Sequence, residues 1–303
     1  MTIHVVGDLC VDSTFRLDRL PGPGETLNAL AAGEGAGGKA ANQAVAAART
    51  GASVTLWAPV GNDPAAGWLE GLVAPEVSTL QLLRFDLPSD RSVIMVDRHG
   101  ENAIVTAVAC AEAFDPLTMG GLRDTWAAGD TLVMQGNLRP AATMACLIAA
   151  KDAGLFTILN PSPLPTEPLD LAAVSLVVVN RVEAAALSGE TEVEKAARRL
   201  LALGAGSVIV TLGEAGALML GAANLPAIHL PAGKADAVDT SGAGDCFTGT
   251  LAGLLAQGVS ISEAARIAMQ AAAIAVGRAG TLASFPTRAE FTALTKTLRL
   301  EKA

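Results

Sequence analysis

The sequence predicts a doubly wound α/β fold, in which helices cover both faces of a mostly parallel sheet and a small β-sheet forms a lid. Three observations support this prediction. After about residue 115, short apolar segments alternate with helical segments, which is the pattern of βαβ units. Hydrophobic residues make up 51% of the 303 residues, enough for a large buried core. Segments 13–36 and 91–108 break the alternation and contain turn signals, so we assign them to the lid of a single domain spanning residues 1–303.

The first hundred residues should contain one strand–helix–strand unit and the two hairpins of the lid. Residues 3–7 are an apolar run typical of a buried strand. Residues 39–49 are strong helix formers that end before Gly51, and 54–59 return to strand character. The turns of the lid are expected at Pro21-Gly-Pro-Gly24 and at Arg98-His-Gly-Glu101, the second between strands 91–97 and 102–108.

The rest of the chain continues the alternation. We expect strands at 131–135, 156–159, 176–180 and 207–212, and helices at 141–153, 182–187 and 191–203. Two Ala-rich helices should follow, at 245–257 and 262–276.

Composition argues against several classes of function. The net charge of −9, without any Lys/Arg cluster, disfavours a nucleic-acid partner. Four scattered Cys without a CxxC pair and three isolated His disfavour disulfides and zinc. The N-terminal residues lack a basic region and a long apolar run, and no stretch is apolar enough to span a membrane. We therefore expect a cytoplasmic protein with no membrane partner.

The most informative segment precedes the helix at 245–257. Gly242, Ala243 and Gly244 stand before Asp245, where the helix begins. A helix start presents unpaired backbone N–H groups and the positive end of the helix dipole, which together bind anions. Asp245 at the same place can accept a proton from a hydroxyl. This pairing of anion hole and base suits phosphoryl transfer from a nucleotide to an alcohol.

A second Gly-rich segment, 33–39, leaves two interpretations open. It nearly matches the phosphate-binding loop, but Ala40 follows Lys39 where that loop needs a hydroxyl. The dinucleotide fingerprint needs a clear preceding strand and a later acid, and both are missing. A flexible hinge before a helix remains, as does a backbone-lined sugar site with Lys39 and Asn42 as polar contacts.

Polar residues at three strand ends are further candidates, because ligands of α/β sheets bind at the carboxyl ends of strands. Asp12 follows the first strand, either as a ligand contact or as a solvated turn acid. Asn180 and Glu183 open a helix, either as a capping pair or with Glu183 holding Mg²⁺ through water and Asn180 near the phosphates. Segment 211–216 makes another strand-to-turn transition, one βα unit before the anion hole.

These motifs, in this order, strongly resemble the PfkB family of carbohydrate kinases over essentially the whole chain. The matching segments are 23–26, 37–44, 180–183, 211–213, 238–245 and 272–276. The GGKxAN sequence at 37–42 together with the Gly-rich segment before Asp245 is highly specific. The resemblance implies the ribokinase-like fold and ATP-dependent phosphorylation of a sugar's primary hydroxyl, with D-ribose or a related pentose as the leading substrate.

The resemblance also assigns roles to individual residues. Asp245 would be the base, and the amides of Gly242, Ala243 and Gly244 the anion hole. The sugar would contact Cys10, Asp12, Gly38, Lys39, Asn42 and Asn137. The nucleotide would contact Asn180, Thr211, Gly213, Gly216, Gly244 and Met269. Besides ATP and Mg²⁺, the ribokinase branch implies a monovalent cation, K⁺, at Asp239, Ser241, Ala275, Arg278, Gly280 and Ser284, and a homodimer formed through the lid.

Two positions depart from the ribokinase pattern. Ribokinases have Asn at the position of Cys10 and Glu at that of Asn137, and both contact ribose hydroxyls. Cys is a weak hydrogen-bonding group and Asn lacks the charged acceptor, so the identity of the sugar stays open. Two alternatives also remain: a nucleoside kinase, disfavoured because the chain lacks Tyr and offers only Phe15 in the first hairpin, and a sugar-binding homologue without catalysis.

Overall fold

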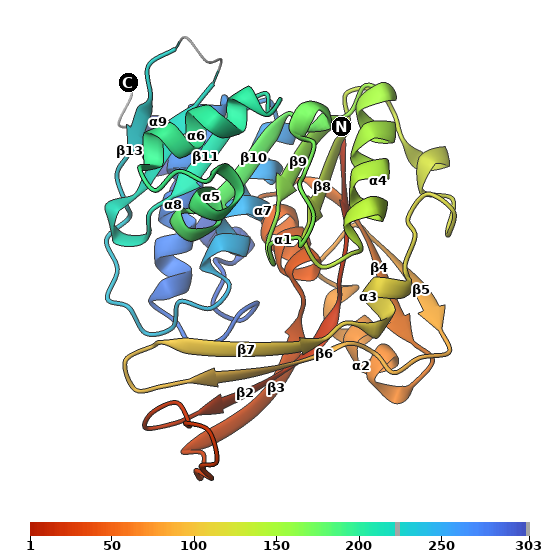
Figure 1. Cartoon of the computed structure of the whole chain (residues 1–303), viewed down its shortest axis with the longest axis vertical. Coiled ribbons are helices and arrows are strands. Elements are labelled where there is room, and N and C mark those ends of the chain that lie inside the picture. The colour runs from red at the N-terminus through yellow and green to blue at the C-terminus, as the bar shows by residue number, and fades with distance from the viewer. Residues whose placement is uncertain (222–224, 301–303) are drawn as a thin grey trace.

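A long, mostly parallel sheet forms the centre of the molecule (Figure 1). The computed structural model describes residues 1–221 and 225–300. Within them, nine strands pair in the order β13-β12-β11-β10-β9-β8-β1-β4-β5. Only β12 and β13 run antiparallel to their neighbours. The strands are β1 (Thr2–Val6), β4 (Ser53–Gly61), β5 (Thr79–Phe85), β8 (Thr131–Gln135), β9 (Phe156–Asn160), β10 (Leu176–Asn180), β11 (Val208–Thr211), β12 (Ala217–Leu220) and β13 (Ile228–Leu230).

Helices cover both faces of this sheet, so its strands are buried on two sides. One core packs α1 (Lys39–Arg49), α2 (Pro64–Val73), α7 (Ala243–Ala256) and α8 (Ile261–Val276) against one face. The other packs α3 (Ala109–Ala113), α4 (Pro140–Asp152), α5 (Arg181–Ser188) and α6 (Val193–Ala202) against the opposite face. Because side chains alternate along a strand, Val5 lies in the first core and Val6 in the second. This two-sided burial explains the continuous apolar strands.

The parallel strands end in polar residues at one edge of the sheet. Gln135 and Asn160 are the last residues of β8 and β9 and lie opposite each other. Asn180 and Thr211 end β10 and β11 and are also register partners. These four side chains form a polar edge of the sheet. The starts of α1 and of α7 lie next to this edge.

Helices α1 and α7 pack at very short range because glycines of α7 face the backbone of α1. A Cβ atom added at Gly249 would collide with the carbonyl oxygen of Gln43, and one at Gly253 would collide with Thr50. The close approach brings the first turn of α7 beside the first turn of α1. Asp245 and Asn42, about two hundred positions apart in sequence, are neighbours for this reason.

A separate sheet of four strands lies along the lower side of the molecule in Figure 1. Its order is β3 (Ala31–Gly37), β2 (Cys10–Arg16), β6 (Arg91–Val96) and β7 (Asn102–Ala107). Ile94 and Ile104 are register partners on one face, and Val93 and Val105 on the other. The face of Ile94 and Ile104, called the inner face below, lies toward the central sheet; the face of Val93 and Val105 is the outer face.

Most of the predicted architecture is confirmed, including the fold class, both hairpins and the helix at Lys39–Arg49. The structure also decides between interpretations that the sequence left open. The hinge at 33–39 is ruled out, because 33–37 belong to strand β3. A turn position for Asp12 is ruled out as well, because Asp12 lies within β2. One predicted boundary was wrong, since helix α7 begins at Ala243, two residues earlier than predicted.

Several elements carried too little signal to be predicted: α2, β5, α3, β12, β13, α9 (Arg288–Leu300) and three short 3-10 helices (Leu122–Thr125, Leu171–Ala173 and Gly213–Ala215). None of the described helices is both long and apolar enough to cross a bilayer.

The contact between α1 and α7 gives a stability prediction. Gly249→Val should lower the free energy of unfolding by about 1–3 kcal/mol, because the added side chain forces the two helices apart. The matched control is Gly67→Ala in α2, where an added Cβ meets nothing within 4 Å. It should raise stability by about 0.5–1 kcal/mol through the better helix propensity of Ala. Urea denaturation measures both, and a wild-type midpoint for Gly249→Val would contradict the packing argument.

Candidate active site

A cavity of about 300 Å³ opens at the polar edge of the central sheet. Its walls come from α1, the small sheet, the ends of β10 and β11, and the start of α7. The lining residues are Lys39, Asn102, Ile104, Asn160, Ser162, Val178, Val179, Asn180, Glu183, Thr211, Thr240, Ser241, Gly242, Gly244, Asp245 and Thr248. The structure thus brings together the predicted base, two anion-hole residues, Lys39 and three of the nucleotide residues.

Asp245 is held in place by two amide side chains of α1. Asn42 donates from Nδ2 to Oδ2 of Asp245 at 3.0 Å, and Gln43 donates from Nε2 to Oδ1 at 2.9 Å. Gln43 also donates to Asn160 Oδ1 and accepts a bond from Gln135 Nε2 at 2.9 Å. Each carboxylate oxygen keeps a second lone pair, so Asp245 is fixed in orientation and can still accept a proton.

Sequence reasoning missed Gln43, Gln135 and Asn160. Gln43 directly follows Asn42 in the GGKxAN-containing segment. Consecutive residues of a helix point in different directions, so the sequence did not show that Gln43 reaches the same carboxylate as Asn42. Gln135 and Asn160 are the last residues of predicted strands. Their position at strand ends was the one available signal.

The start of α7 has the geometry of an anion hole. Gly242 caps the helix with φ 74°, a conformation that favours glycine, and an added Cβ there would press on the ring of Phe285. An added Cβ at Gly244 would meet nothing within 4 Å, so space is open in front of this turn. Gly242 and Gly244 line the cavity, whereas the amide of Ala243 between them donates to Thr240 O at 3.4 Å. A helix start that borders open space can receive an anion.

Lys39 supplies a positive charge between several carboxylates. The nearby carboxylate of Asp245 raises the pKa of Lys39 and outweighs the opposing effect of burial. Asp8 and Asp12 add smaller contributions in the same direction. Lys39 is thus held in its charged form, where it can balance a sugar-bound or nucleotide-bound anion.

Two buried acids accompany Lys39. Burial raises the pKa of Asp8 to about 6, although its Oδ1 accepts a bond from Ala40 N at 3.1 Å. Burial also raises the pKa of Asp12. Asp8 was not among the predicted site residues, because its neighbours come from α1 and α7 rather than from its own segment.

The two positions that depart from the ribokinase pattern lie in different surroundings. The Cys10 thiol is buried, donates to Asp12 Oδ1 at 3.4 Å and lies 3.4 Å from Ser92 Oγ. Burial raises the pKa of this thiol well above its ordinary value, so it stays protonated. Asn137 Oδ1 and Asn42 Oδ1 are buried and find no hydrogen-bond partner among the described residues. Such acceptors suit the donor groups of a hydroxylated ligand.

The residues expected at the nucleotide are only partly gathered. Asn180 and Glu183 form a capping box, in which Asn180 Oδ1 accepts from Glu183 N at 2.8 Å and Glu183 Oε2 accepts from Asn180 N at 2.9 Å. Gly216 has φ 90°, and an added Cβ would collide with Leu230 O. Met269 is only 7% exposed and packs in the core that contains α1, α2, α7 and α8. The capping interpretation of Asn180 and Glu183 is therefore confirmed.

Two of the residues expected at a monovalent cation, Ser241 and Gly280, bond to the buried carboxylate of Asp239. Asp239 Oδ1 accepts from Ser241 N at 3.0 Å, and Oδ2 accepts from Gly280 N at 3.1 Å. Oδ2 also receives the guanidinium of Arg16 at 3.0 Å. Ala275 and Ser284 are fully buried, and Arg278 pairs with Glu290.

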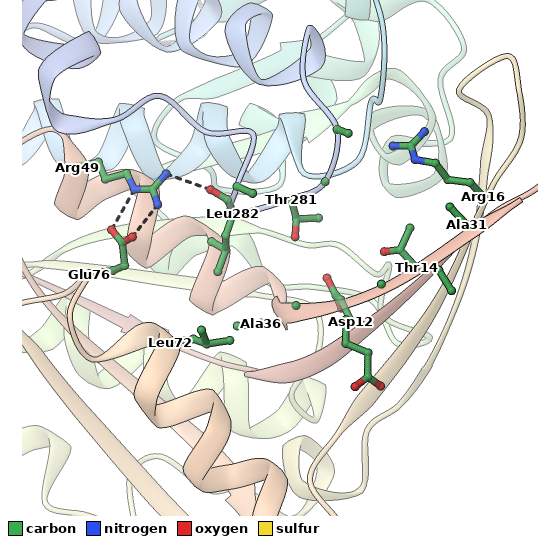
Figure 2. Close-up of a pocket in the computed structure, with 17 residues that line it drawn as sticks. Asp12, Thr14, Arg16, Ala31, Ala36, Arg49, Leu72, Glu76, Thr281 and Leu282 are labelled. Atoms are coloured by element: carbon green, nitrogen blue, oxygen red, sulfur yellow. Dashed lines mark hydrogen bonds and ion pairs between the residues drawn. The ribbon is translucent and has the colours of Figure 1, made fainter.

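A second cavity, of about 510 Å³, lies between the small sheet and segment 279–283 (Figure 2). Figure 2 shows Asp12, Thr14 and Arg16 in a row along β2. Arg49 closes one end, where it pairs with Glu76 and donates to Leu282 O at 3.0 Å. Asp12 lines this second cavity and not the first, so the structure does not bring all predicted sugar contacts to one wall.

Comparison with known proteins agrees with this geometry. The pfkB family carbohydrate kinase profile matches residues 2–288. Mouse ribokinase is 32% identical over 295 residues, covering 94% of this chain and 91% of the mouse protein. The deoxyribokinase of Salmonella typhimurium is 31% identical over 301 residues, covering 96% of this chain and 97% of that protein.

Solved structures agree as well. Ribokinase from Thermotoga maritima superposes with a TM-score of 0.87 at 32% identity, covering 97% of this chain and 99% of that one. Arabidopsis thaliana ribokinase, complexed with ribose and ATP, superposes with a TM-score of 0.81 at 25% identity, covering 97% and 98%.

The raised pKa of Asp8 gives a prediction for stability against pH. The folded protein holds the Asp8 proton up to about pH 6, whereas the unfolded chain releases it near the ordinary value of 3.8. Stability from this group is therefore lost as pH rises between these values. Asp8→Asn keeps an acceptor for Ala40 N without the charge, so it should stabilise the protein by about 2–3 kcal/mol at pH 8 and by little at pH 4.

Asp63 is the opposite-sign control. Its hydrogen bonds from Ser89 and Ala66 lower its pKa, so its contribution is present at neutral pH and is lost as pH falls. Asp63→Asn should be less stable than wild type at pH 8, and the gap should close at low pH. Denaturation at several pH values measures both variants, and equal stability of Asp8→Asn and wild type at pH 8 contradicts the buried charge.

Proposed function

The chain belongs to the pfkB family of carbohydrate kinases, and we propose that it transfers the terminal phosphoryl group of ATP to the primary hydroxyl of ribose or a related pentose. One observation carries this proposal. The carboxylate of Asp245 is held by Asn42 and Gln43 at the first turn of α7, where Gly242 and Gly244 line an open cavity. A base and an anion hole within one turn are the two groups that phosphoryl transfer to an alcohol needs.

The proposed reaction uses little covalent chemistry of the protein. Asp245 accepts the proton of the sugar hydroxyl as the hydroxyl oxygen attacks the terminal phosphorus of ATP. The bond from this phosphorus to the bridging oxygen breaks, and ADP leaves with the electron pair. The negative charge of the transferring group is stabilised by the amides of Gly242, Ala243 and Gly244 and by the charge of Lys39. Positioning and electrostatic stabilisation therefore account for most of the catalysis.

We assign the sugar to the space between α1 and the inner face of the small sheet. Lys39 and Asn42 stand at the start of α1, and Asp12 lies on the inner face of β2. An added Cβ at Gly38 would press on the backbone of Asp8 and Leu9, so this corner is lined by backbone. The unpartnered acceptors Asn42 Oδ1 and Asn137 Oδ1 suit sugar hydroxyls.

We assign the nucleotide to the strand ends of β10 and β11. Asn180 and Thr211 line the cavity there. Gly213 and Gly216 follow β11 and are proposed to lie along the adenosine. Contact between Met269 and the adenine stays a prediction, because this side chain is only 7% exposed. The neighbouring Arabidopsis ribokinase was solved with ribose and ATP, which supports ATP as the donor.

The residues present fit a magnesium ion carried by the nucleotide. Among the described residues, no group of three or more His, Cys, Asp or Glu is placed to hold a metal. Mg²⁺ commonly keeps several waters and binds with substrate phosphates, and Glu183 lines the cavity as a carboxylate that would hold it through water. The ion would neutralise phosphate charge.

The K⁺ ion at Asp239 stays a prediction. No step of the reaction is assigned to it, because Arg16 already pairs with this carboxylate.

The small sheet is proposed to act as a lid over the sugar and as the interface of a homodimer. Its inner face supplies Asn102 and Ile104 to the cavity. Its outer face exposes Val93 by 38% and Val105 by 68%. Exposed apolar residues side by side suit an interface between copies, which sedimentation equilibrium tests directly. A cytoplasmic location stays a prediction.

A 2-deoxypentose is the second candidate substrate, and Cys10 favours it. The Cys10 thiol contacts Asp12 and Ser92 within the protein, so it offers a sugar hydroxyl little hydrogen bonding. A sugar that lacks one hydroxyl loses nothing at such a position. The similarity to a Salmonella deoxyribokinase agrees with this candidate.

Asp245→Asn tests the proposed function. The variant should lose about 10²–10⁴-fold in turnover, because general-base catalysis typically contributes this much. Its affinity for ATP should stay close to wild type, since Asp245 is not assigned to the nucleotide. Coupled ADP-release assays and calorimetry measure the two quantities. Residual activity above about a tenth of wild type would contradict the base assignment.

The same assay with pentoses, hexoses and nucleosides separates the sugar kinase from a nucleoside kinase or a non-catalytic binder.

The double variant Cys10→Asn with Asn137→Glu tests the sugar. It adds hydrogen-bonding groups at both departing positions, so the KM for ribose should fall about tenfold or more, equivalent to about 1.4 kcal/mol. The KM for 2-deoxyribose should change less. Unchanged or worse ribose kinetics would mean that both positions serve another sugar, and a deoxy-sugar or hexose should then outperform ribose in the wild-type enzyme.

A further inference from the structure

The buried carboxylate of Asp239 is neutralised by an arginine from a different part of the chain. Asp239 is 1% exposed, and Arg16, 35% exposed, donates to it at 3.0 Å. Backbone amides of Ser241 and Gly280 complete its hydrogen bonds. A buried carboxylate is costly without a charged partner, so this ion pair accounts for the charge at this position.

The ion pair lies directly before the anion hole. Asp239 precedes Gly242 by three residues, and Ser241 between them lines the catalytic cavity. Ser241 also accepts a bond from Asn102 Nδ2 at 3.3 Å. Segment 239–241 is therefore tied to the small sheet twice, through Arg16 of β2 and Asn102 of β7.

The inner face of β2 carries both Arg16 and a proposed sugar contact. Asp12, Thr14 and Arg16 follow one another at every second residue, which places them on the same face of the strand (Figure 2). Strand β2 thus contributes Asp12 to the proposed sugar site and Arg16 to the contact with segment 239–241.

The arrangement fits a monovalent cation poorly. Asp239 Oδ2 already holds Gly280 N and the Arg16 guanidinium. A second cation on this carboxylate would lie close to Arg16 and be repelled by it.

We propose that the Arg16 guanidinium takes the place of a monovalent cation beside the anion hole, so that this chain does not depend on K⁺. Arg16 acts as a positioning residue: it holds segment 239–241, and with it the amides of Gly242 and Gly244, in the geometry that receives the transferring group. Because Arg16 belongs to the small sheet, the anion hole is fully braced only when this sheet is in place. The inference rests on the proposed kinase activity for its catalytic consequence.

The first test compares turnover in KCl and in choline chloride of equal ionic strength. Wild type should differ by less than about twofold between the two salts, whereas Arg16→Ala should lose about tenfold in choline chloride and recover most of it in KCl. The effect should fall on kcat more than on the KM for the sugar, because the proposed role of Arg16 is to position the anion hole and not to bind the sugar. Arg16→Lys, which keeps the charge, should stay independent of K⁺.

Two further variants serve as controls. Arg91→Ala removes an arginine of the same sheet that pairs with Glu34 at the surface, and it should behave as wild type in both salts. Arg16→Ala combined with Asp239→Asn should gain nothing from KCl, because the carboxylate that would hold the ion is gone. A merely structural role of Arg16 would lower activity equally in both salts.

The second test needs no substrate. Thermal unfolding of Arg16→Ala should shift upward in KCl relative to choline chloride, while wild type and Arg91→Ala should not respond to the change of cation. K⁺ activation or K⁺ stabilisation of wild type would overturn the proposal, as would an Arg16→Ala variant that is indifferent to K⁺ in both measurements. If no sugar is phosphorylated at all, the proposed function fails, and the thermal measurement still decides the role of Arg16.

Discussion

The hydrogen bonds from Asn42 and Gln43 to Asp245 are the interaction on which the rest of the site depends. They exist because α1 and α7 approach closely enough for Gly249 to face the carbonyl of Gln43. The glycines of α7 therefore set the distance between the two helix starts. The chain of bonds continues through Gln43 to Gln135 and Asn160, which attaches Asp245 to the ends of β8 and β9. Buried networks of this kind hold one orientation because every broken bond would leave a polar group unpaired.

Charge is balanced within the same small volume. Lys39 stands among Asp8, Asp12 and Asp245, and the carboxylates keep it positive despite burial. Burial in turn raises the pKa values of Asp8 and Asp12. The proposed catalytic site therefore holds one buried cation among three carboxyl groups, and the start of α7 with Lys39 is the part of it that would favour an incoming phosphate.

The small sheet contributes to this site as much as the central one does. Its β7 strand brings Asn102 to Ser241, and its β2 strand brings Arg16 to Asp239. Both contacts end on the segment that leads into the anion hole. If the small sheet closes over a sugar as proposed, these contacts would link that closure to the position of the segment before α7.

The sequence by itself determined the fold class, the helix at Lys39–Arg49, the two hairpins and the Gly-rich helix start at 242–245, because each of these depends on residues close together in the chain. The capping box of Asn180 and Glu183 was also visible as one of two interpretations. Only the tertiary structure decided that 33–37 belong to an edge strand, that Asn42 and Gln43 both donate to Asp245, and that Cys10 bonds to Asp12. It alone paired Arg16 with Asp239, which lie 223 positions apart. Local propensity and spacing carry no information on such contacts, because packing of the helices and of the small sheet brings these residues together.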